Sequence, residues 1–281
     1  MDLISPDFED MLKPNMELKK FPDGDSYIRV PQIKECEGKD VRIYHRLYPE
    51  QDSGIVQTLL ILEALRGVAK SVTLISPYLP YSRQDKVFLD GEVKSGELVC
   101  SLLSRAGVKK LITLDCHFLK KEGEAEYAGL KINSISMNTE LIEHAKAKFA
   151  GEKFEVISPD QGANYLVKDV GGKSMKKVRG GYMGSDETYR VIESLEGDFN
   201  FKGKNVLILD DMISTGSTMM RAVENVRNGE AKKIVCAATH GFFLKDCLGK
   251  LRQVADEVFS TNSIPNAVAE VSVKNMLVNA K

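Results

Sequence analysis

Two adjacent carboxylates, Asp210 and Asp211, stand between a short apolar run and a loop of small hydroxyl residues. The run Val206–Leu209 fits a strand that is buried on both faces of a parallel sheet. An apolar pattern with helical spacing begins at Met219. The loop between strand and helix consists of Ser214, Thr215, Gly216, Ser217 and Thr218.

This order of strand, acidic pair, small loop and helix predicts a phosphate-binding site at a helix N-terminus. Backbone N–H groups and the hydroxyls of Thr215, Ser217 and Thr218 can donate to phosphate oxygens, and Gly216 lets the backbone approach closely. The acidic pair can accept hydrogen bonds from sugar hydroxyls or hold a cation. The GK[ST] ending of a Walker P-loop is absent. A Ser- or Thr-capped helix beside two exposed carboxylates is the alternative interpretation.

A second group of polar side chains follows the apolar run Val72–Ser76. Two prolines stop regular structure in residues 77–86, and ligands bind after the carboxyl ends of strands in open α/β sheets. Arg83 and Gln84 offer several donors there, which suit a triphosphate and a nucleotide edge. A solvated loop with a structural arginine is the alternative.

The turn signal Pro22-Asp23-Gly24 within residues 19–30 predicts a hairpin or a loop tip. Phe21, Asp23 and Asp25 also place an aromatic face beside two acceptors, which can stack on a purine and bond its exocyclic amine. On the pattern alone, the structural turn is the simpler interpretation.

His117 and Asp160 follow the predicted strands 110–114 and 154–158, and each has a structural alternative. A histidine after a strand is often structural, and Asp160 can cap the helix that follows it. A glycine-rich basic segment, residues 171–189, predicts either a mobile basic lid or a solvated hairpin. Its cations are Lys173, Lys176, Lys177 and Arg179.

Five of these segments resemble motifs of one family. Residues 206–219 are similar to the phosphoribosyl-diphosphate-binding motif that phosphoribosyltransferases and ribose-phosphate pyrophosphokinases share. Residues 77–86, PYLPYSRQDK, resemble a pyrophosphokinase signature that the transferases lack, and residues 21–25 resemble that family's FxDGE-type segment. The D-x-H at 115–117 and the S-P-D at 158–160 match as well. The chain therefore resembles the ribose-phosphate pyrophosphokinases over nearly its whole length.

The resemblance implies a reaction of ATP with ribose 5-phosphate that gives 5-phosphoribosyl 1-diphosphate and AMP. It implies Mg²⁺ as cofactor, held by His117 and Asp160, and catalysis by Lys177 and Arg179 in a flexible loop. The implied ATP contacts are Phe21, Asp23, Gly24, Asp25, Arg83 and Gln84. The implied ribose 5-phosphate contacts are Arg179, Asp210, Asp211, Ser214, Thr215, Gly216, Ser217 and Thr218.

The sequence departs from the family pattern at several places, and three of them lie in or beside the predicted binding and catalytic segments. Asp25 stands where the family has Glu, Ser214 where it often has Asp, and Gly180-Gly181 where bulkier residues are common. The last change can alter closure of the catalytic loop. In the family, the segment at residues 21–25 often reaches the adenine of a neighbouring subunit, so the resemblance also implies a homo-oligomer, a dimer or larger.

The alternation of predicted strands and helices favours an α/β fold with two domains. By resemblance, both are phosphoribosyltransferase-like, each with a mostly parallel sheet flanked by helices. Residues 1–137 are expected to form the N-terminal domain with the ATP-binding loops. Residues 138–266 are expected to hold the ribose 5-phosphate motif and the catalytic loop, and residues 267–281 to pack back on the first domain.

Composition excludes several classes of partner for the 281-residue chain. A net charge of −1 provides no overall field for nucleic acid or membrane surfaces, and no apolar run approaches a membrane span. The acidic start does not resemble a signal peptide. Five cysteines without a CxxC favour neither a disulfide framework nor a zinc site, so we expect a cytoplasmic protein.

Two other functions stay open at this point. A phosphoribosyltransferase would use the diphosphate product, although residues 77–86 argue against it. A non-catalytic regulatory paralogue of the synthetase would be an interaction protein. Such paralogues typically interrupt the catalytic loop, whereas the Lys, Arg, His and Asp positions are all filled here. Formation of AMP from ATP discriminates among the three.

Overall fold

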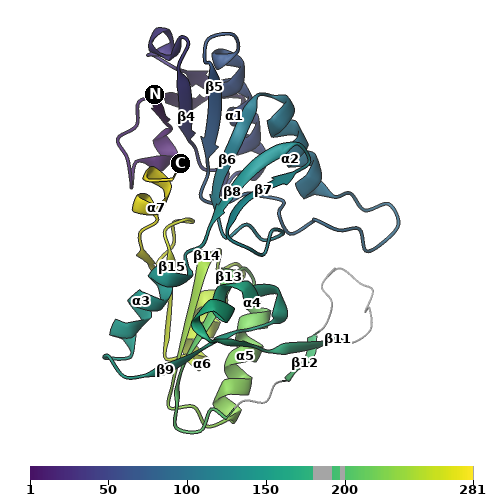
Figure 1. Ribbon diagram of the computed structural model, residues 1–281, viewed down its shortest axis with the longest axis vertical. Coiled ribbons are helices and arrows are strands. Elements are labelled where there is room, and N and C mark those ends of the chain that lie inside the picture. Colours follow the sequence, from purple (N-terminus) through teal and green to yellow (C-terminus); the bar gives the residue numbers. More distant parts are fainter. Residues whose placement is uncertain (180–191, 197–199, 281) are drawn as a thin grey trace. The chain divides into compact units, whose positions relative to one another are not determined.

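The computed structural model describes residues 1–179, 192–196 and 200–280, which fold into two α/β units (Figure 1). The N-terminal unit consists of Met1–Ile135 with Val273–Lys281, and the C-terminal unit of Ser136–Ser272. Each unit has its own six-stranded sheet with mostly parallel strands and flanking helices. The fold class expected from the sequence is therefore confirmed.

The sheet of the N-terminal unit has the strand order β1-β4-β5-β6-β8-β7. Its neighbours are parallel except β7, which pairs with β8 as an antiparallel hairpin. In chain order the strands are β1 (Asp2–Ile4), β4 (Asp40–Tyr44), β5 (Ser71–Ile75), β6 (Val108–Leu114), β7 (Gly123–Tyr127) and β8 (Leu130–Ile135).

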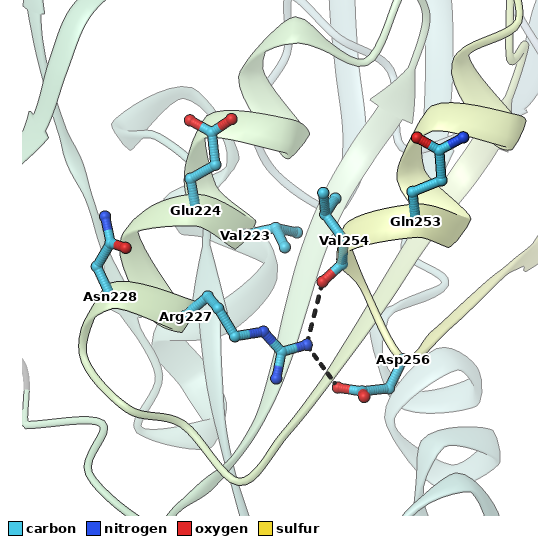
Figure 2. A pocket seen from close by; sticks show the side chains of 7 residues that line it. All are labelled: Val223, Glu224, Arg227, Asn228, Gln253, Val254 and Asp256. Carbon is cyan, nitrogen blue, oxygen red and sulfur yellow. Dashed lines mark hydrogen bonds and ion pairs between the residues drawn. The ribbon is translucent and has the colours of Figure 1, made fainter.

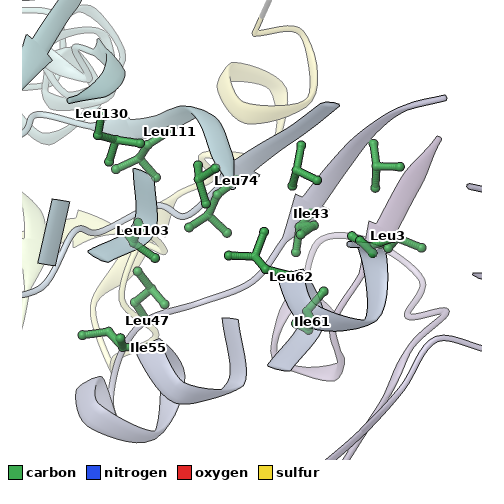
Figure 3. Close-up of a cluster of buried hydrophobic side chains, with 14 of the residues drawn as sticks. Leu3, Ile43, Leu47, Ile55, Ile61, Leu62, Leu74, Leu103, Leu111 and Leu130 are labelled. Carbon is green, nitrogen blue, oxygen red and sulfur yellow. The ribbon is translucent and has the colours of Figure 1, made fainter. Parts of the chain in front are cut away.

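Helices and a separate hairpin complete this unit. The α-helices are α1 (Gln51–Leu65), α2 (Ser95–Arg105) and α7 (Lys274–Val278), and the short 3-10 helices are Pro6–Phe8 and Ile33–Cys36. β2 (Glu17–Lys20) and β3 (Ser26–Arg29) form a two-stranded antiparallel sheet. The sheet and α1 share a core of branched aliphatic side chains, including Ile43, Leu62 and Leu74 (Figure 3).

The C-terminal unit has an entirely parallel sheet of order β10-β9-β13-β14-β15-β16. In chain order its strands are β9 (Phe154–Ser158), β10 (Lys173–Ser174), β13 (Asn205–Ile213), β14 (Lys233–Gly241), β15 (Glu257–Thr261) and β16 (Ala269–Val271). Nearly every residue of β13 is buried, as expected for a strand covered on both faces.

The helices of this unit are α3 (Asn138–Lys148), α4 (Asn164–Val167), α5 (Ser217–Asn228) and α6 (Cys247–Val254), with 3-10 turns at Gln161–Ala163 and Lys168–Val170. Helix α5 buries Met219, Ala222, Val223 and Val226, the face predicted from the apolar spacing. A small antiparallel pair, β11 (Lys176–Arg179) and β12 (Ile192–Glu196), stands apart from the main sheet.

Several elements differ from the sequence-based prediction. The central strand β13 continues through the acidic pair to Ile213, and β14 continues to Gly241, because both remain paired with each other beyond their apolar runs. The hairpin β7–β8 was not predicted, because its exposed edge strand lacks an apolar run.

The end of the chain belongs to the N-terminal unit. The Arg42 guanidinium on β4 donates to the carbonyls of Leu277 and Val278 at 3.1 and 3.0 Å. These bonds satisfy carbonyls at the C-terminus of α7, which have no partner within the helix. Across the described part of the chain, no helix combines the length and the apolarity that crossing a membrane would need.

We expect Ile208→Ala to lower the free energy of unfolding of the C-terminal unit by about 2–5 kcal/mol, and Ile208→Val by about 0.5–1.5 kcal/mol. The reason is that Ile208 is fully buried on the central strand β13, where a cavity cannot collapse easily. Denaturant unfolding of the purified variants measures both. Val170→Ala, at a 48% exposed position of the same unit, is the control and should change little. Equal losses at positions 208 and 170 would contradict this placement of the core.

Candidate active site

The predicted functional residues fall at the carboxyl edge of each sheet. In the N-terminal unit, residues 77–86 follow β5 and His117 follows the neighbouring parallel strand β6. In the C-terminal unit, Asp160 follows β9, and Asp210 lies near the end of the adjacent parallel strand β13. Because neighbouring parallel strands end on the same side, each sheet gathers its own set of side chains.

The loop 77–86 is anchored to the end of the sheet by its backbone. The Pro77 carbonyl accepts from the Leu114 N–H at 3.1 Å and from the Thr113 hydroxyl at 3.3 Å. Farther along, the Gln84 carbonyl accepts from the N–H of Gly96 at 3.2 Å. A side chain at Gly96 would place its Cβ 3.0 Å from the Tyr81 carbonyl oxygen, so α2 approaches this loop closely. The loop is therefore held at both ends.

The side chains of this loop are open to solvent at the positions expected to bind ATP. Arg83 is exposed and Gln84 is half-buried. Beside them lies a cavity of about 310 Å³ at the start of α1 and the beginning of the loop. It is lined by Gln51, Asp52, Tyr78, Pro80 and Tyr81. The Tyr81 hydroxyl donates to the Asp52 carboxylate across this cavity.

The turn between β2 and β3 has the geometry of a structural hairpin and also exposes the predicted ATP contacts. The Phe21 N–H donates to the Asp25 carbonyl at 2.8 Å, and the Asp23 carboxylate accepts from the Asp25 N–H at 3.1 Å. Gly24 has a φ of +97°, which a residue with a side chain rarely adopts. Phe21 is 51% exposed and meets Tyr27 edge-on at 5.8 Å. An exposed aromatic face is thus present.

His117 stands just beyond β6 and is half-buried. The preceding Asp115 is buried with a left-handed φ of +34°, and its N–H donates to the Ile135 carbonyl at 3.0 Å. The Cys116 N–H donates to the Ser134 hydroxyl at 2.9 Å. These hydrogen bonds tie the turn to β8 and so fix the backbone position of His117.

The acidic pair of the C-terminal unit is held in an environment that disfavours negative charge. Asp211 is buried and Asp210 is half-buried, and the Asp211 N–H donates to an oxygen of the Asp210 carboxyl at 2.9 Å. Burial, together with the nearby carboxylates of Asp211 and Asp160, raises the pKa of Asp210 well above its ordinary value. A bound cation or a set of sugar hydroxyls at this place would relieve that repulsion.

Asp160 has the local geometry of a turn cap. One of its carboxylate oxygens accepts from the Gly162 N–H at 2.6 Å, and its carbonyl accepts from the Ser158 hydroxyl at 2.9 Å. The structural role considered for this residue is therefore present. Its effect on the pKa of Asp210 shows that the two carboxylates are also neighbours. A capping role and a ligand role are compatible, because a carboxylate has several acceptor sites.

The donor chemistry of the C-terminal unit fits Mg²⁺. Within the ranges that the structure describes, no group of three or more His, Cys, Asp or Glu side chains is arranged to hold a metal ion. Mg²⁺ typically keeps several waters and binds through one or two carboxylates together with substrate phosphates. The carboxylates of Asp160, Asp210 and Asp211 supply that kind of oxygen ligand and repel one another without a cation.

The ribose-phosphate loop, residues 214–218, turns the chain from β13 into α5. Gly216 is the N-cap of α5, with a left-handed φ of +78°, and among the described residues it has no side-chain cap. The first N–H groups of the helix are thus left for a ligand, and their dipoles favour an anion. The Thr215 and Ser217 hydroxyls lie 3.4 Å apart at the same end. The alternative of a Ser- or Thr-capped helix is not what this loop adopts.

In the basic segment the structure describes residues 171–175 with their side chains, whereas of β11 and its partner strand β12 it describes the backbone alone. Lys177 and Arg179 lie in β11, opposite Leu195 and Ile192 of β12. The Met175 N–H, just before β11, donates to the Ser158 carbonyl at 3.1 Å, two residues from Asp160. The base of this hairpin therefore starts at the carboxyl edge of the sheet. Gly180-Gly181 lie outside the described residues.

One segment that contacts the site was not expected from the sequence. Residues 242–247, which connect β14 to α6 and include the first residue of α6, run alongside the ribose-phosphate loop, and the Leu244 N–H donates to the Ser214 carbonyl at 3.0 Å. No motif marks this segment, and its short apolar run, Phe242 to Leu244, does not indicate a contact with the loop. Only the pairing of β14 with β13 brings it there.

A larger cavity, about 730 Å³, lies at the opposite end of α5 from the ribose-phosphate loop (Figure 2). It is lined by Val223, Glu224, Arg227, Asn228, Gln253, Val254 and Asp256. Arg227 spans its floor, donating to the Val254 carbonyl at 3.0 Å and to the Asp256 carboxylate at 2.9 Å (Figure 2). These bonds tie the ends of α5 and α6 together, and none of the predicted site residues lines this cavity.

The fold and the two sites define an α/β protein of phosphoribosyltransferase-like type with an additional N-terminal domain. Residues 10–107 match the family model of the N-terminal domain of ribose phosphate pyrophosphokinase, and residues 162–275 match that of the phosphoribosyl transferase domain. A ribose-phosphate pyrophosphokinase of Sulfurisphaera tokodaii is 35% identical over 92% of this chain and 87% of its own. One of Pyrococcus furiosus is 32% identical over 94% and 91%. The chain belongs to the ribose-phosphate pyrophosphokinase family.

A solved structure has the same fold. It is the phosphoribosylpyrophosphate synthetase of Mycobacterium smegmatis, which matches with a TM-score of 0.78 over 99% of this chain and 96% of its own. The sequence identity is 24%, so this likeness concerns the fold alone.

We expect Asp210→Asn to raise the thermal midpoint of the protein, with a gain that grows from pH 5 to pH 8. A carboxyl whose pKa is raised by folding binds more protons in the folded state, so it lowers stability increasingly as pH rises above its ordinary pKa of about 3.9. The asparagine removes that penalty. Differential scanning calorimetry without ligands measures it, with exposed Asp169→Asn as the control. The same shift at both pH values would show that Asp210 is an ordinary ionised carboxylate.

Proposed function

We propose that this protein is a ribose-phosphate diphosphokinase, which transfers the β,γ-diphosphate of ATP to the 1-hydroxyl of ribose 5-phosphate. The observation behind the proposal is the presence, in one chain of this family, of the loop 77–86 on one sheet and the ribose-phosphate loop on another. A phosphoribosyltransferase would need only the second. The match of residues 10–107 to the pyrophosphokinase N-terminal domain therefore favours synthesis of the diphosphate.

Ribose 5-phosphate binds at the start of α5. Its phosphate accepts hydrogen bonds from the uncapped N–H groups and from the hydroxyls of Thr215, Ser217 and Thr218, with Ser214 at the rim. Asp210 and Asp211 accept hydrogen bonds from the sugar hydroxyls, which orients the anomeric carbon. Hydrogen bonds from these hydroxyls favour the ionised form of Asp210, whose pKa is raised by burial and by the neighbouring carboxylates.

ATP is held by the N-terminal unit. Arg83 and Gln84 bind the triphosphate and the nucleotide, while Phe21, Asp23, Gly24 and Asp25 contact the adenine. These turn residues are all exposed in a single chain. This exposure is what a residue shared with a neighbouring subunit requires, and we propose a homo-oligomer, a dimer or larger, in which that neighbour completes the adenine site.

In the reaction, the 1-hydroxyl oxygen of the sugar attacks the β-phosphorus of ATP. A bond forms between this oxygen and the β-phosphorus, and the bond from the β-phosphorus to the α,β-bridging oxygen breaks. AMP then leaves, and the hydroxyl proton is released. Transfer of this kind depends on positioning and on neutralising charge. Lys177 and Arg179 neutralise the transferring diphosphate, and Arg179 also contacts ribose 5-phosphate. Mg²⁺, which His117 and Asp160 would hold with ATP, supplies further neutralisation of the phosphate oxygens.

The five cysteines of the chain are all buried and unbonded. Burial raises the pKa of Cys100 to about 12 and keeps that thiol protonated and unreactive. Free thiols of this kind are usual in a reducing compartment, so we propose that the enzyme acts in the cytoplasm.

We expect incubation with ATP, Mg²⁺ and ribose 5-phosphate to produce AMP in step with consumption of the sugar. AMP is the product because the attack falls on the β-phosphorus. Anion-exchange separation of the nucleotides measures it, and reactions that lack the sugar or contain excess EDTA serve as controls. ADP as the sole nucleotide product would show ordinary kinase chemistry, and no product at all would favour a regulatory paralogue.

We expect Lys177→Ala or Arg179→Ala to lower kcat by about 10²-fold or more, since cations brought to a transferring phosphoryl group contribute on the order of 10³–10⁵ in rate. The thermal midpoint and the affinity for ATP should change little, because the two residues act mainly in the transition state. Steady-state kinetics with ATP-binding calorimetry separates these effects. Lys168→Ala, an exposed cation of the same unit, is the matched control. Full activity in both variants would show that this segment is a solvated hairpin without a catalytic role.

A further inference from the structure

The segment 242–247 braces the ribose-phosphate loop from behind. The N–H groups of Phe242 and Phe243 donate to the Ile213 carbonyl at 2.9 and 3.2 Å, and the Leu244 N–H donates to the Ser214 carbonyl at 3.0 Å. Three successive backbone donors thus bind the two carbonyls that precede the loop's turn. The brace fixes the direction in which the chain leaves β13.

Cys247 completes the contact by filling the space behind Gly216. A Cβ at position 216 would lie 2.3 Å from the Cys247 sulfur, far inside contact distance. Cys247 is fully buried, so its side chain has little room to move aside. Gly216 has a φ of +78°, and it is the residue from which α5 begins. The sulfur therefore packs directly on the backbone whose N–H groups face the phosphate position.

The backbone that presents Cys247 is itself in an uncommon conformation. Phe243, Lys245 and Asp246 have φ values of +49°, +53° and +57°, in the left-handed region that residues with a Cβ seldom adopt. Each such residue costs of order 1 kcal/mol or more, so the surrounding contacts must hold them. Cys247 begins α6, and its N–H donates to the Leu244 carbonyl at 3.1 Å. The short helix thus anchors the thiol in place.

We propose that Cys247 is a positioning residue for the reaction. Its sulfur, supported by the brace 242–246, sets the position of the Gly216 backbone, so that the loop's N–H groups converge on the 5-phosphate of the sugar. This inference rests on the proposed function of the ribose-phosphate loop. The thiol does not touch the substrate. It acts through the backbone of Gly216, by shape and without charge.

The electrical neutrality of Cys247 suits this role. Burial raises the pKa of its thiol to about 11, so it is protonated at neutral pH. A carboxylate or thiolate behind the loop would repel the incoming phosphate. A neutral, polarizable sulfur fills the same volume without that repulsion.

The first test is to enlarge the side chain. Cys247→Val adds a methyl group against Gly216 and is expected to weaken ribose 5-phosphate binding by about 10-fold or more, because small displacements of positioning groups have large effects. The KM for ATP should change by less than about 2-fold, since the N-terminal unit holds the nucleotide. Cys247→Ser adds no bulk and should leave ribose 5-phosphate binding near normal. Cys236→Val is the matched control, a fully buried thiol of the same unit on β14.

The second test uses compensation between the two positions. Gly216→Ala introduces the Cβ that meets the sulfur, and we expect it to raise the dissociation constant for ribose 5-phosphate by at least about 30-fold. Cys247→Ala in the same chain removes the sulfur and should recover about 5-fold or more of that loss, which is a non-additive coupling of neighbouring residues. The left-handed φ of position 216 prevents complete recovery.

Isothermal titration calorimetry with ribose 5-phosphate tests the positioning role of Cys247, and AMP formation by the unaltered chain tests the proposed function separately. Binding without AMP formation would end the proposed function and leave the positioning role to be judged from the variants. Two results overturn the positioning role. One is that Cys247→Val and Cys236→Val lower the thermal midpoint alike and leave sugar binding unchanged. The other is that the losses from positions 216 and 247 simply add.

Discussion

The parallel pairing of β13 with β9 and β14 is the constraint on which the C-terminal site depends. Parallel neighbours bring their carboxyl ends to one edge, so Asp160, the acidic pair and the brace arrive together from distant parts of the sequence. The interior of these strands is largely apolar, and the polar side chains of the predicted site lie at the carboxyl edge. The polar residues of the predicted site are therefore concentrated at this edge of the sheet.

That concentration has an electrostatic cost. Three carboxylates lie near the ends of β9 and β13, and burial of Asp210 together with the repulsion from Asp211 and Asp160 raises its pKa. A protein without a ligand gains nothing from such an arrangement, whereas a site for sugar hydroxyls and cations does. The uncapped start of α5 follows the same logic, because its unpaired donors face a place where phosphate is expected. In the proposed function, both features lower the stability of the free protein and increase its affinity for ribose 5-phosphate.

The N-terminal unit applies the same architecture to a different ligand. Its loops after β5 and β6 emerge from one edge, with Arg83 and His117 as the side chains of interest. The loop 77–86 is held by hydrogen bonds at Pro77 and at Gln84, so its backbone is anchored to the sheet and to α2. Two sheets of similar construction thus each gather predicted site residues at the carboxyl edge, and in the proposed function each set binds one of the two substrates.

The sequence by itself determined the central elements of the C-terminal unit and the family of this protein. The apolar run Val206–Leu209 and the helical spacing from Met219 are local patterns, and they fixed β13, α5 and the loop between them. The family followed from short motifs whose residues are contiguous. The length of β13, the burial of Asp211 and the elevated pKa of Asp210 came only from tertiary structure, because they depend on β14 and on Asp160. Cys247 shows this most plainly, since its contact with Gly216 joins positions 31 residues apart in sequence through a strand pairing that no local pattern encodes.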